Sequence, residues 1–196
     1  MPFNNLKIDI IINSSCLINN ICKKKFIAII VGAGFVNTKR NGASHVKKNE
    51  GEIVKFNSGK QWAVSKWVEL AQMLHDCGYK VALLGDQRDS ELLKEFDLNN
   101  LNDFTGKLTI SESIALVSRA SIAIGGDTGL MHCASLVGTK TLSLFGCTDS
   151  SEYKPYGNKA SVYSLGVECS PCFGTKRIAL CKYPKCIRNI QVIDIY

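Results

Sequence analysis

The stretch Ser121-Ile-Ala-Ile-Gly-Gly-Asp-Thr-Gly-Leu-Met-His-Cys-Ala134 decides the fold of this chain. Residues 121–124 form a short apolar run that is typical of a buried strand. Residues 130–137 place apolar side chains on one helical face, and Gly138 is suited to end that helix. A second apolar run follows at 141–145. The stretch therefore predicts a strand-to-helix turn within a βαβ unit.

The turn at residues 125–129 is a candidate ligand site. Open α/β sheets bind ligands where a strand ends and a helix begins, and the amide groups of a helix's first turn suit a phosphate. Asp127, Thr128 and His132 would place a carboxylate, a hydroxyl and an imidazole around that anion, and Leu130 and Met131 would lie under a nucleotide. The competing interpretation is a tight turn in which Asp127 or Thr128 only caps the helix.

The rest of the chain repeats the alternation of strand and helix. Residues 26–31 are a continuous apolar run, as in a strand buried on both faces of a parallel sheet. A clear helical period begins at Val64, a strand follows at 80–84, and helices are expected at 89–96 and after a Ser111 cap. The order β-α-β-α-α-β-α-β predicts a Rossmann-like, doubly wound parallel sheet. After residue 145 the pattern fades into loops and short elements.

Three motifs together resemble one family. Thr105-Gly106-Lys107, the turn described above, and Leu144-Phe145-Gly146-Cys147-Thr148 occur in the order found in the C-terminal domain of family 9 glycosyltransferases. These are the bacterial heptosyltransferases that transfer heptose from ADP-heptose to the lipopolysaccharide inner core. Their pattern is roughly D-S/T-G-x-x-H-x-A, then L-F-G-x-T. The resemblance covers about residues 26–190 and implies the C-terminal half of a GT-B enzyme, which has two Rossmann-like domains facing a cleft.

The length of 196 residues suits one such domain. We expect residues 1–25 to be an N-terminal remnant or linker. Residues 26–196 would form the nucleotide-sugar-binding domain, with a cysteine-bearing tail at 169–190. The resemblance puts the catalytic base, an aspartate, in the family's N-terminal domain, and nothing in residues 1–25 matches it. We therefore expect no catalytic residue in this chain and no sugar transfer by the chain alone.

A lysine is expected to bind the donor phosphates beside the turn after the first strand. The family has a Gly-Ala turn there, followed by a lysine directly before a tryptophan. Here Lys39 lies at the expected distance from the turn, but Lys60-Gln-Trp62 comes some twenty residues later, as if an insertion separated the two halves. Either lysine could bind phosphate, and Lys60 matches the family more fully. Both could also be exposed loop lysines.

An acidic residue after the second strand would suit the ribose hydroxyls of a nucleotide. Asp86 and Asp89 are both candidates, and a helix-capping role is the stronger interpretation for Asp89. The predicted donor-binding residues are Gly32, Ala33, Lys39, Lys60, Asp86, Gly126, Asp127, Thr128, Gly129, Leu130 and His132.

The nine cysteines include the series Cys169-x2-Cys172-x8-Cys181-x4-Cys186. The first pair has the spacing of zinc ligands, but the second pair is more loosely spaced. The tail also looks like the cysteine-bearing tail of the family, where packing is the simpler role. We expect reduced thiols, or an adventitious disulfide, with no stoichiometric metal and no cofactor.

A net charge of +7 favours anionic partners, although a merely solvated surface explains any single cluster equally well. The predicted partners are a nucleotide-sugar donor, ADP-heptose, and a lipopolysaccharide-core acceptor reached through the missing N-terminal domain, without nucleic acid. No apolar run approaches the roughly 20 residues that span a bilayer. We expect a cytoplasmic protein, and its basic surface is compatible with peripheral association with the inner membrane.

Three other functions are compatible with parts of the sequence. A Rossmann-type oxidoreductase would need the third glycine of the dinucleotide fingerprint after residues 32–34, which is missing. A cysteine–zinc nucleic-acid module would explain the charge and the tail but not the glycine turn. A catalytically inactive remnant, or one half of a split gene, would share the fold and bind only nucleotide.

Overall fold

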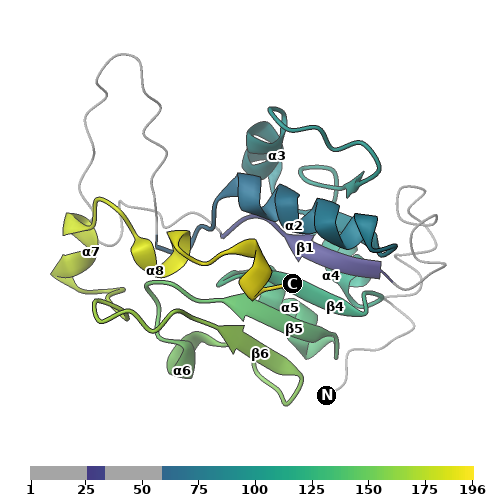
Figure 1. Ribbon diagram of the computed structural model, residues 1–196. Coiled ribbons are helices and arrows are strands. Elements are labelled where there is room, and N and C mark those ends of the chain that lie inside the picture. Colours follow the sequence, from purple (N-terminus) through teal and green to yellow (C-terminus); the bar gives the residue numbers. More distant parts are fainter. Residues whose placement is uncertain (1–25, 34–58) are drawn as a thin grey trace.

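The computed structural model describes residues 26–33 and 59–196, and these form an α/β fold around one sheet (Figure 1). All neighbouring strands of the sheet are parallel, in the order β3-β2-β1-β4-β5-β6. The order reverses between β1 and β4, so the predicted Rossmann-like, doubly wound sheet is confirmed. The strands are β1 (Phe26–Ile30), β2 (Lys80–Leu84), β3 (Asn102–Asp103), β4 (Ile122–Gly126), β5 (Lys140–Leu144) and β6 (Ala160–Tyr163).

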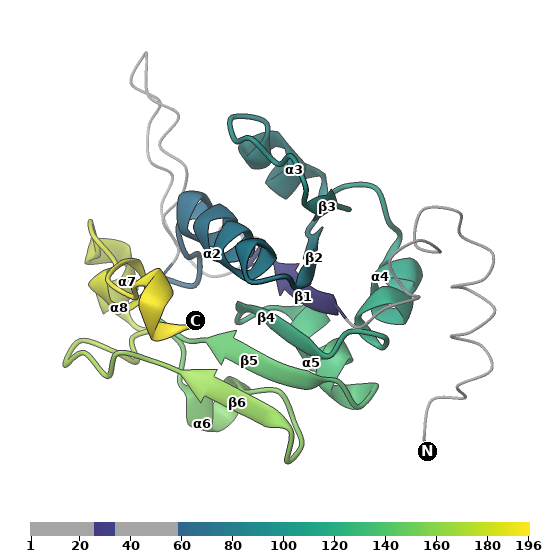
Figure 2. The same ribbon diagram turned by 45° about the vertical axis from the view of Figure 1, so that its right-hand side comes forward.

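Helices cover both faces of this sheet, as the two views show (Figures 1 and 2). The described helices are α2 (Val64–Asp76), α3 (Gln87–Leu93), α4 (Ile110–Val117), α5 (Gly129–Leu136), α6 (Ser150–Tyr153), α7 (Lys176–Leu180), α8 (Lys185–Arg188) and the 3-10 turn η1 (Val192–Asp194).

Alternate side chains of the strands pack into two separate hydrophobic cores, one on each face of the sheet. On one face Ile27 and Ile29 of β1 pack with Trp67 and Leu70 of α2. On the other face Ala28 and its alternate neighbours pack with α4 and α5. Successive side chains of a strand point to opposite faces, so a strand buried on both sides must be apolar throughout. This is why the short apolar runs predicted the central strands so closely.

Two strands and two helix starts differ from the sequence prediction. The edge strands β3 and β6 were not expected, because two polar residues form β3 and β6 is only partly buried. Helix α3 begins at Gln87 rather than residue 89, because Asp86 is its N-cap. Helix α4 is capped by Thr109 rather than Ser111, in a capping box with Glu112.

The end of the chain belongs to the core rather than to a loose tail. The indole nitrogen of Trp62 donates to the carbonyl oxygen of Ile190 over 3.0 Å. The ammonium of Lys66 donates to the same oxygen over 2.6 Å. Ile187, Ile190 and Val192 are buried in the core that α2 covers. Figures 1 and 2 show this yellow segment lying beside α2, so it closes one face of the sheet.

We predict that Gly146→Ala destabilises the protein. A Cβ at this position would overlap the carbonyl oxygen of Gly59 and lie 2.9 Å from the Cβ of Ile187. Overpacking of this kind costs about 1–3 kcal/mol of unfolding free energy. Urea denaturation measures the loss. Gly129→Ala is the matched control, because its added Cβ meets no atom within 4 Å. Equal stability of the two variants would contradict the close approach of Gly59 to Gly146.

Candidate functional site

The candidate site lies at the carboxyl edge of the sheet, where β1 and β4 are neighbours. Ile30 of β1 pairs with Gly125 of β4, so the turns that follow the two strands lie side by side. The strand order reverses at this point, and open α/β sheets bind ligands in the crevice that such a reversal creates. A third segment, residues 59–62, crosses this edge and brings in Lys60.

An almost buried ion pair joins the crossing segment to the turn after β4. The Lys60 Nζ lies 2.7 Å from the Oδ2 of Asp127, and the two side chains are only 14% and 7% exposed. The same ammonium lies 4.6 Å from the centroid of the Phe173 ring. A charge this poorly hydrated is tolerated only when it is paired. Lys60 and Asp127, both predicted from sequence, therefore meet in one place.

The capping interpretation of the turn is wrong. Thr128 is the N-cap residue of α5, but its side chain makes no capping hydrogen bond. The carboxylate of Asp127 is directed to Lys60 instead of to the helix. The first turn of α5 thus keeps its amide groups free of side-chain caps, which leaves the positive end of the helix dipole for a ligand.

Gly125 and Gly126 of the turn lack side chains for different steric reasons. A Cβ on Gly125 would lie 2.9 Å from the sulfur of Met131, so Gly125 allows close packing in the core. A Cβ on Gly126 would lie 3.1 Å from the carbonyl oxygen of Lys60, so Gly126 admits the crossing segment. Met131 is fully buried beneath the turn, which corrects its expected place under a nucleotide. At Gly129 the space around an added Cβ is open.

Gln61 was missed by sequence reasoning and holds the end of β1. Its side-chain oxygen accepts from the amide of Ala33 over 3.0 Å, and its side-chain nitrogen donates to the carbonyl of Val31 over 3.1 Å. Gln61 therefore acts on the Gly32-Ala33 turn as an extra strand partner would. The only signal for it was its place between Lys60 and Trp62 in the family motif.

Both acidic residues after β2 belong to the capping box of α3, so the capping interpretation is confirmed for Asp89 and extends to Asp86. Asp86 is the N-cap of α3 and forms an ion pair with Arg88, which holds the pKa of the Asp86 carboxyl below its usual value. Asp89 accepts from the amide of Asp86 over 2.8 Å, and its carboxyl fills the space where Gly32 and Gly85 lack a Cβ. Burial raises the pKa of Asp89. The acid that lies against the Gly32 turn is thus Asp89.

The Thr105-Gly106-Lys107 motif shapes the neighbouring strand end. Asp103 accepts hydrogen bonds from the Thr105 amide and hydroxyl and from the Lys107 ammonium. Burial acts to raise the pKa of Asp103, but these hydrogen bonds keep it below the usual value. Gly106 has a φ of 67°, and its amide bonds to the carbonyl of Gly85. This motif therefore ties the end of β3 to the end of β2.

The other predicted residues lie near the same edge or outside the described part of the chain. Leu130 and His132 are half-buried in the first turn and a half of α5. Lys39 and residues 1–25, including the expected remnant or linker, lie outside the described residues.

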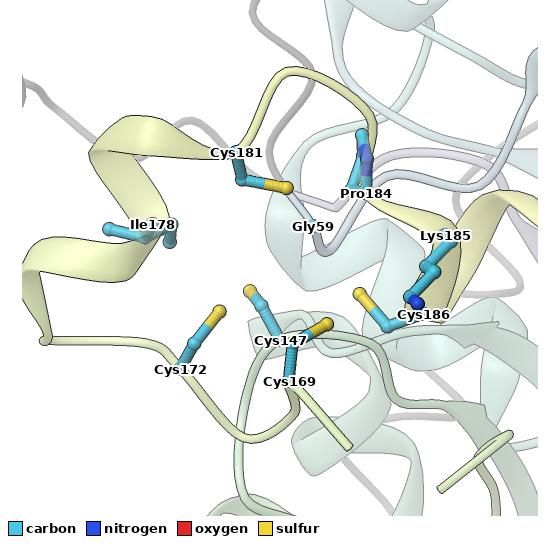
Figure 3. A pocket seen from close by; sticks show the side chains of 9 residues that line it. All are labelled: Gly59, Cys147, Cys169, Cys172, Ile178, Cys181, Pro184, Lys185 and Cys186. Atoms are coloured by element: carbon cyan, nitrogen blue, oxygen red, sulfur yellow. The ribbon is translucent and has the colours of Figure 1, made fainter. Parts of the chain in front are cut away.

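Five cysteines line one small cavity next to the crossing segment (Figure 3). Four are the expected tail cysteines, and the fifth is Cys147 at the end of β5. All five are free thiols. Burial, reinforced by the neighbouring cysteines, raises the pKa of Cys147 to about 12 and that of Cys186 to about 11. Within residues 26–33 and 59–196, no three Cys, His, Asp or Glu side chains already stand in an arrangement that could hold a metal ion.

Comparison with known proteins decides the family. The sequence pattern of glycosyltransferase family 9 (heptosyltransferase) matches residues 54–182, which is more than half of the chain. The chain belongs to glycosyltransferase family 9. This membership includes the Lys60 segment, the glycine turn and most of the cysteine tail. It decides against the oxidoreductase and nucleic-acid-module alternatives.

Relatives of this family 9 chain are similar over only part of their length. It is 31% identical over 121 residues to lipooligosaccharide heptosyltransferase 2 of Haemophilus influenzae, covering 56% of this chain and 34% of the relative. It is 24% identical over 161 residues to lipooligosaccharide heptosyltransferase 2 of Campylobacter jejuni, and this match covers 78% of this chain and 49% of the relative. The chain thus spans about a third to a half of the curated relatives it matches.

Solved structures share its fold at low identity. The E. coli ADP-heptose lipopolysaccharide heptosyltransferase II superposes with a TM-score of 0.66 at 18% identity, covering 100% of this chain and 50% of that one. An E. coli heptosyltransferase solved with ADP superposes with a TM-score of 0.55 at 15% identity. This match covers 83% of this chain and 43% of that one. Among the described helices, none has the length and apolar character needed to cross a membrane.

We predict that Lys60→Met costs about 1–3 kcal/mol of unfolding free energy, because it leaves the Asp127 carboxylate buried without a partner. Adding Asp127→Asn should recover part of the loss, since no charge then remains unpaired. Guanidinium denaturation measures both. The control is Lys94→Met, whose ion pair with Glu91 is more than half exposed and should be worth well under about 1 kcal/mol. A Lys60→Met loss no greater than that of the control would contradict a stabilising role for the pair.

Proposed function

We propose that this chain is the donor-binding domain of a heptosyltransferase and binds a nucleoside diphosphate sugar, ADP-heptose, at the carboxyl edge of β1 and β4. The observation that carries the proposal is the almost buried Lys60 ammonium beside the uncapped first turn of α5. Both are sources of positive potential, and they lie at the reversal of strand order. The structural similarity to an E. coli heptosyltransferase solved with ADP supports the choice of nucleotide.

Lys60 can serve a diphosphate while it stays paired with Asp127. An ammonium has three donors, so an ion pair with one carboxylate oxygen of Asp127 still leaves donors for phosphate oxygens. Asp127 would then orient the lysine, and Phe173 would shield it from water on one side. Thr128 would add a hydroxyl donor at the helix end. The proposal assigns Lys60 and Thr128 to the phosphates, with the backbone amides from Gly126 to Gly129.

The other predicted donor residues would surround the rest of the nucleotide. The Gly32-Ala33 turn lies at the same edge, where the Gln61 side chain bonds to the backbone on either side of Gly32. Asp86 remains a proposed ribose contact, and the position of Asp89 against Gly32 makes Asp89 its closest competitor. His132 and Leu130 would contact the sugar diphosphate from the first turns of α5. Lys39 stays a prediction.

This geometry suits the departure of a diphosphate from a sugar. An acceptor hydroxyl forms a bond to the anomeric carbon, the bond from that carbon to the diphosphate oxygen breaks, and a base takes the hydroxyl proton. Lys60 and the α5 amides would stabilise the charge that gathers on the departing diphosphate. We assign no base among the described residues. The family resemblance puts it in the N-terminal domain, so acceptor and base would be supplied there.

The positive charge of the tail supports the proposal that the domain works near an anionic acceptor. Residues 169–193 contain five lysines and arginines and no acidic residue. Such a segment attracts phosphorylated lipid headgroups and anionic membrane surfaces. We propose that the lipopolysaccharide core is the acceptor and that the domain works at the cytoplasmic face of the inner membrane.

We predict that the chain binds ADP and that Lys60→Ala and Thr128→Val each weaken binding. A hydrogen bond to a charged group is worth about 1.5–3 kcal/mol, which corresponds to roughly 10- to 150-fold in affinity. Calorimetry with ADP, UDP and GDP measures the effect, with circular dichroism to verify folding. The control is Lys140→Ala, which removes an exposed lysine at the opposite, amino end of β5. Failure of all three nucleotides to bind would overturn the donor-site assignment.

A second prediction concerns turnover. The chain alone should transfer no heptose from ADP-heptose to a lipopolysaccharide-core acceptor, while a family N-terminal domain supplied in trans should restore transfer. General-base assistance contributes about 10²–10⁴-fold, and positioning of two substrates contributes several kcal/mol more. Product formation by mass spectrometry measures both cases. Transfer by the chain alone would contradict our assignment of the base, and no transfer in either case would favour an inactive, nucleotide-binding remnant.

A further inference from the structure

An aromatic pair lies beside Lys60, and shielding of the lysine accounts for only one of its two rings. The Lys60 ammonium lies 4.6 Å from the centroid of the Phe173 ring. The Tyr153 ring stands edge-on to that Phe173 ring, with the two centroids 6.2 Å apart and the ring planes at 77°. Phe173 is half-buried, whereas Tyr153 is 41% exposed. Contact with the lysine therefore explains Phe173 but leaves Tyr153 without a role.

Backbone contacts near the end of β5 fix the positions of both rings. Helix α6 is capped by Asp149, whose carboxylate accepts hydrogen bonds from the amide and hydroxyl of Ser151. The amide of Tyr153 donates to the carbonyl of Asp149 over 2.9 Å. The amide of Phe173 donates to the carbonyl of Cys147, also over 2.9 Å. Figures 1 and 2 show α6 beside the arrowheads of β5 and β6, so the pair belongs to the carboxyl edge of the sheet.

The aromatic pair and the acidic residues after β2 lie on opposite sides of the proposed diphosphate site. Asp86 and Asp89 follow β2, Lys60 lies where β1 and β4 are neighbours, and the pair lies at the end of β5. These parallel strands follow one another in the order β2, β1, β4, β5. Neighbouring strands are about 4.8 Å apart, so β2 and β5 are roughly 14 Å apart, which an extended nucleoside diphosphate sugar can span. With the ribose at β2 and the diphosphate beside Lys60, the glycosyl group would extend toward β5.

The chemistry of the exposed ring suits a sugar. A sugar ring carries C–H groups on its faces, which pack against aromatic rings, and hydroxyls around its rim, which need hydrogen-bonding partners. A tyrosine offers an apolar ring and a polar hydroxyl together. Within residues 26–33 and 59–196, the Tyr153 hydroxyl has no hydrogen-bond partner, so it can bond to a ligand. A purine base would also stack on such a ring, but it would lie beyond the ribose, on the β2 side of the diphosphate.

We propose that Tyr153 and Phe173 form the subsite for the glycosyl group of the donor. The Tyr153 ring packs against the sugar and its hydroxyl bonds to a sugar hydroxyl, while Phe173 holds the ring next to the lysine that binds the diphosphate. This inference rests on the proposed function of Lys60. It implies that Tyr153 contributes to the binding of the sugar nucleotide and contributes nothing to the binding of the nucleoside diphosphate alone.

The test compares the affinities of the full chain for ADP-heptose and for ADP by calorimetry. Tyr153→Ala should weaken ADP-heptose binding at least about threefold and leave the ADP affinity within about twofold of the unmodified chain. Tyr153→Phe keeps the ring, so it should lose less affinity for ADP-heptose than Tyr153→Ala does. The control is Tyr156→Ala, which removes a ring that is 85% exposed in the same connection between β5 and β6 and should change neither affinity. Circular dichroism verifies that each variant is folded.

Equal weakening of ADP and ADP-heptose binding by Tyr153→Ala would overturn the glycosyl subsite, because the ring would then serve the nucleoside diphosphate. Unchanged ADP-heptose binding by Tyr153→Ala would also overturn it, while the proposed function would stand. If the unmodified chain bound neither ligand, the proposed function would fail and the subsite with it. The behaviour of the unmodified chain therefore distinguishes the two failures.

Discussion

The ion pair between Lys60 and Asp127 is the interaction on which the candidate site depends. The ammonium and the carboxylate are almost entirely shielded from water, so burying either charge without the other would cost free energy. The pair joins a segment that precedes α2 to the turn after β4, which are far apart in the sequence. The Asp127 carboxylate is paired with Lys60, and the Thr128 side chain makes no capping hydrogen bond to the first turn of α5. In our proposal, the feature that stabilises the edge is therefore also the one that would prepare it for an anion.

Neighbours of Lys60 extend this junction to the other strands. The carbonyl of Gly59 accepts from Cys147 at the end of β5, the Gln61 side chain bonds to the end of β1, and the Trp62 indole donates to the C-terminal segment. Four consecutive residues thus fix three strand ends and the tail. This explains why Gly126 and Gly146 lack side chains, since a Cβ at either would press on the backbone of this segment.

The sequence predicts the centre of the fold better than its edges, for physical reasons. Strand β2 has the expected bounds of residues 80–84, because burial on both faces demands a continuous apolar run. The polar edge strand β3 gives no such signal. Lys60 could be selected from its motif, but its pairing with Asp127 could not, since periodicity says nothing about distant contacts. Gln61 and Cys147 were missed, and the choice between Asp86 and Asp89 stayed open, for the same reason: these contacts arise only when separate strand ends meet.

The measurement that tests this account most directly is a crystal structure of the chain with ADP. The account predicts a diphosphate at the first turn of α5, within hydrogen-bonding distance of the Lys60 ammonium and the Thr128 hydroxyl, with Lys60 still paired with Asp127. A nucleotide bound elsewhere, or one whose phosphates contact neither Lys60 nor the amides of α5, would contradict it.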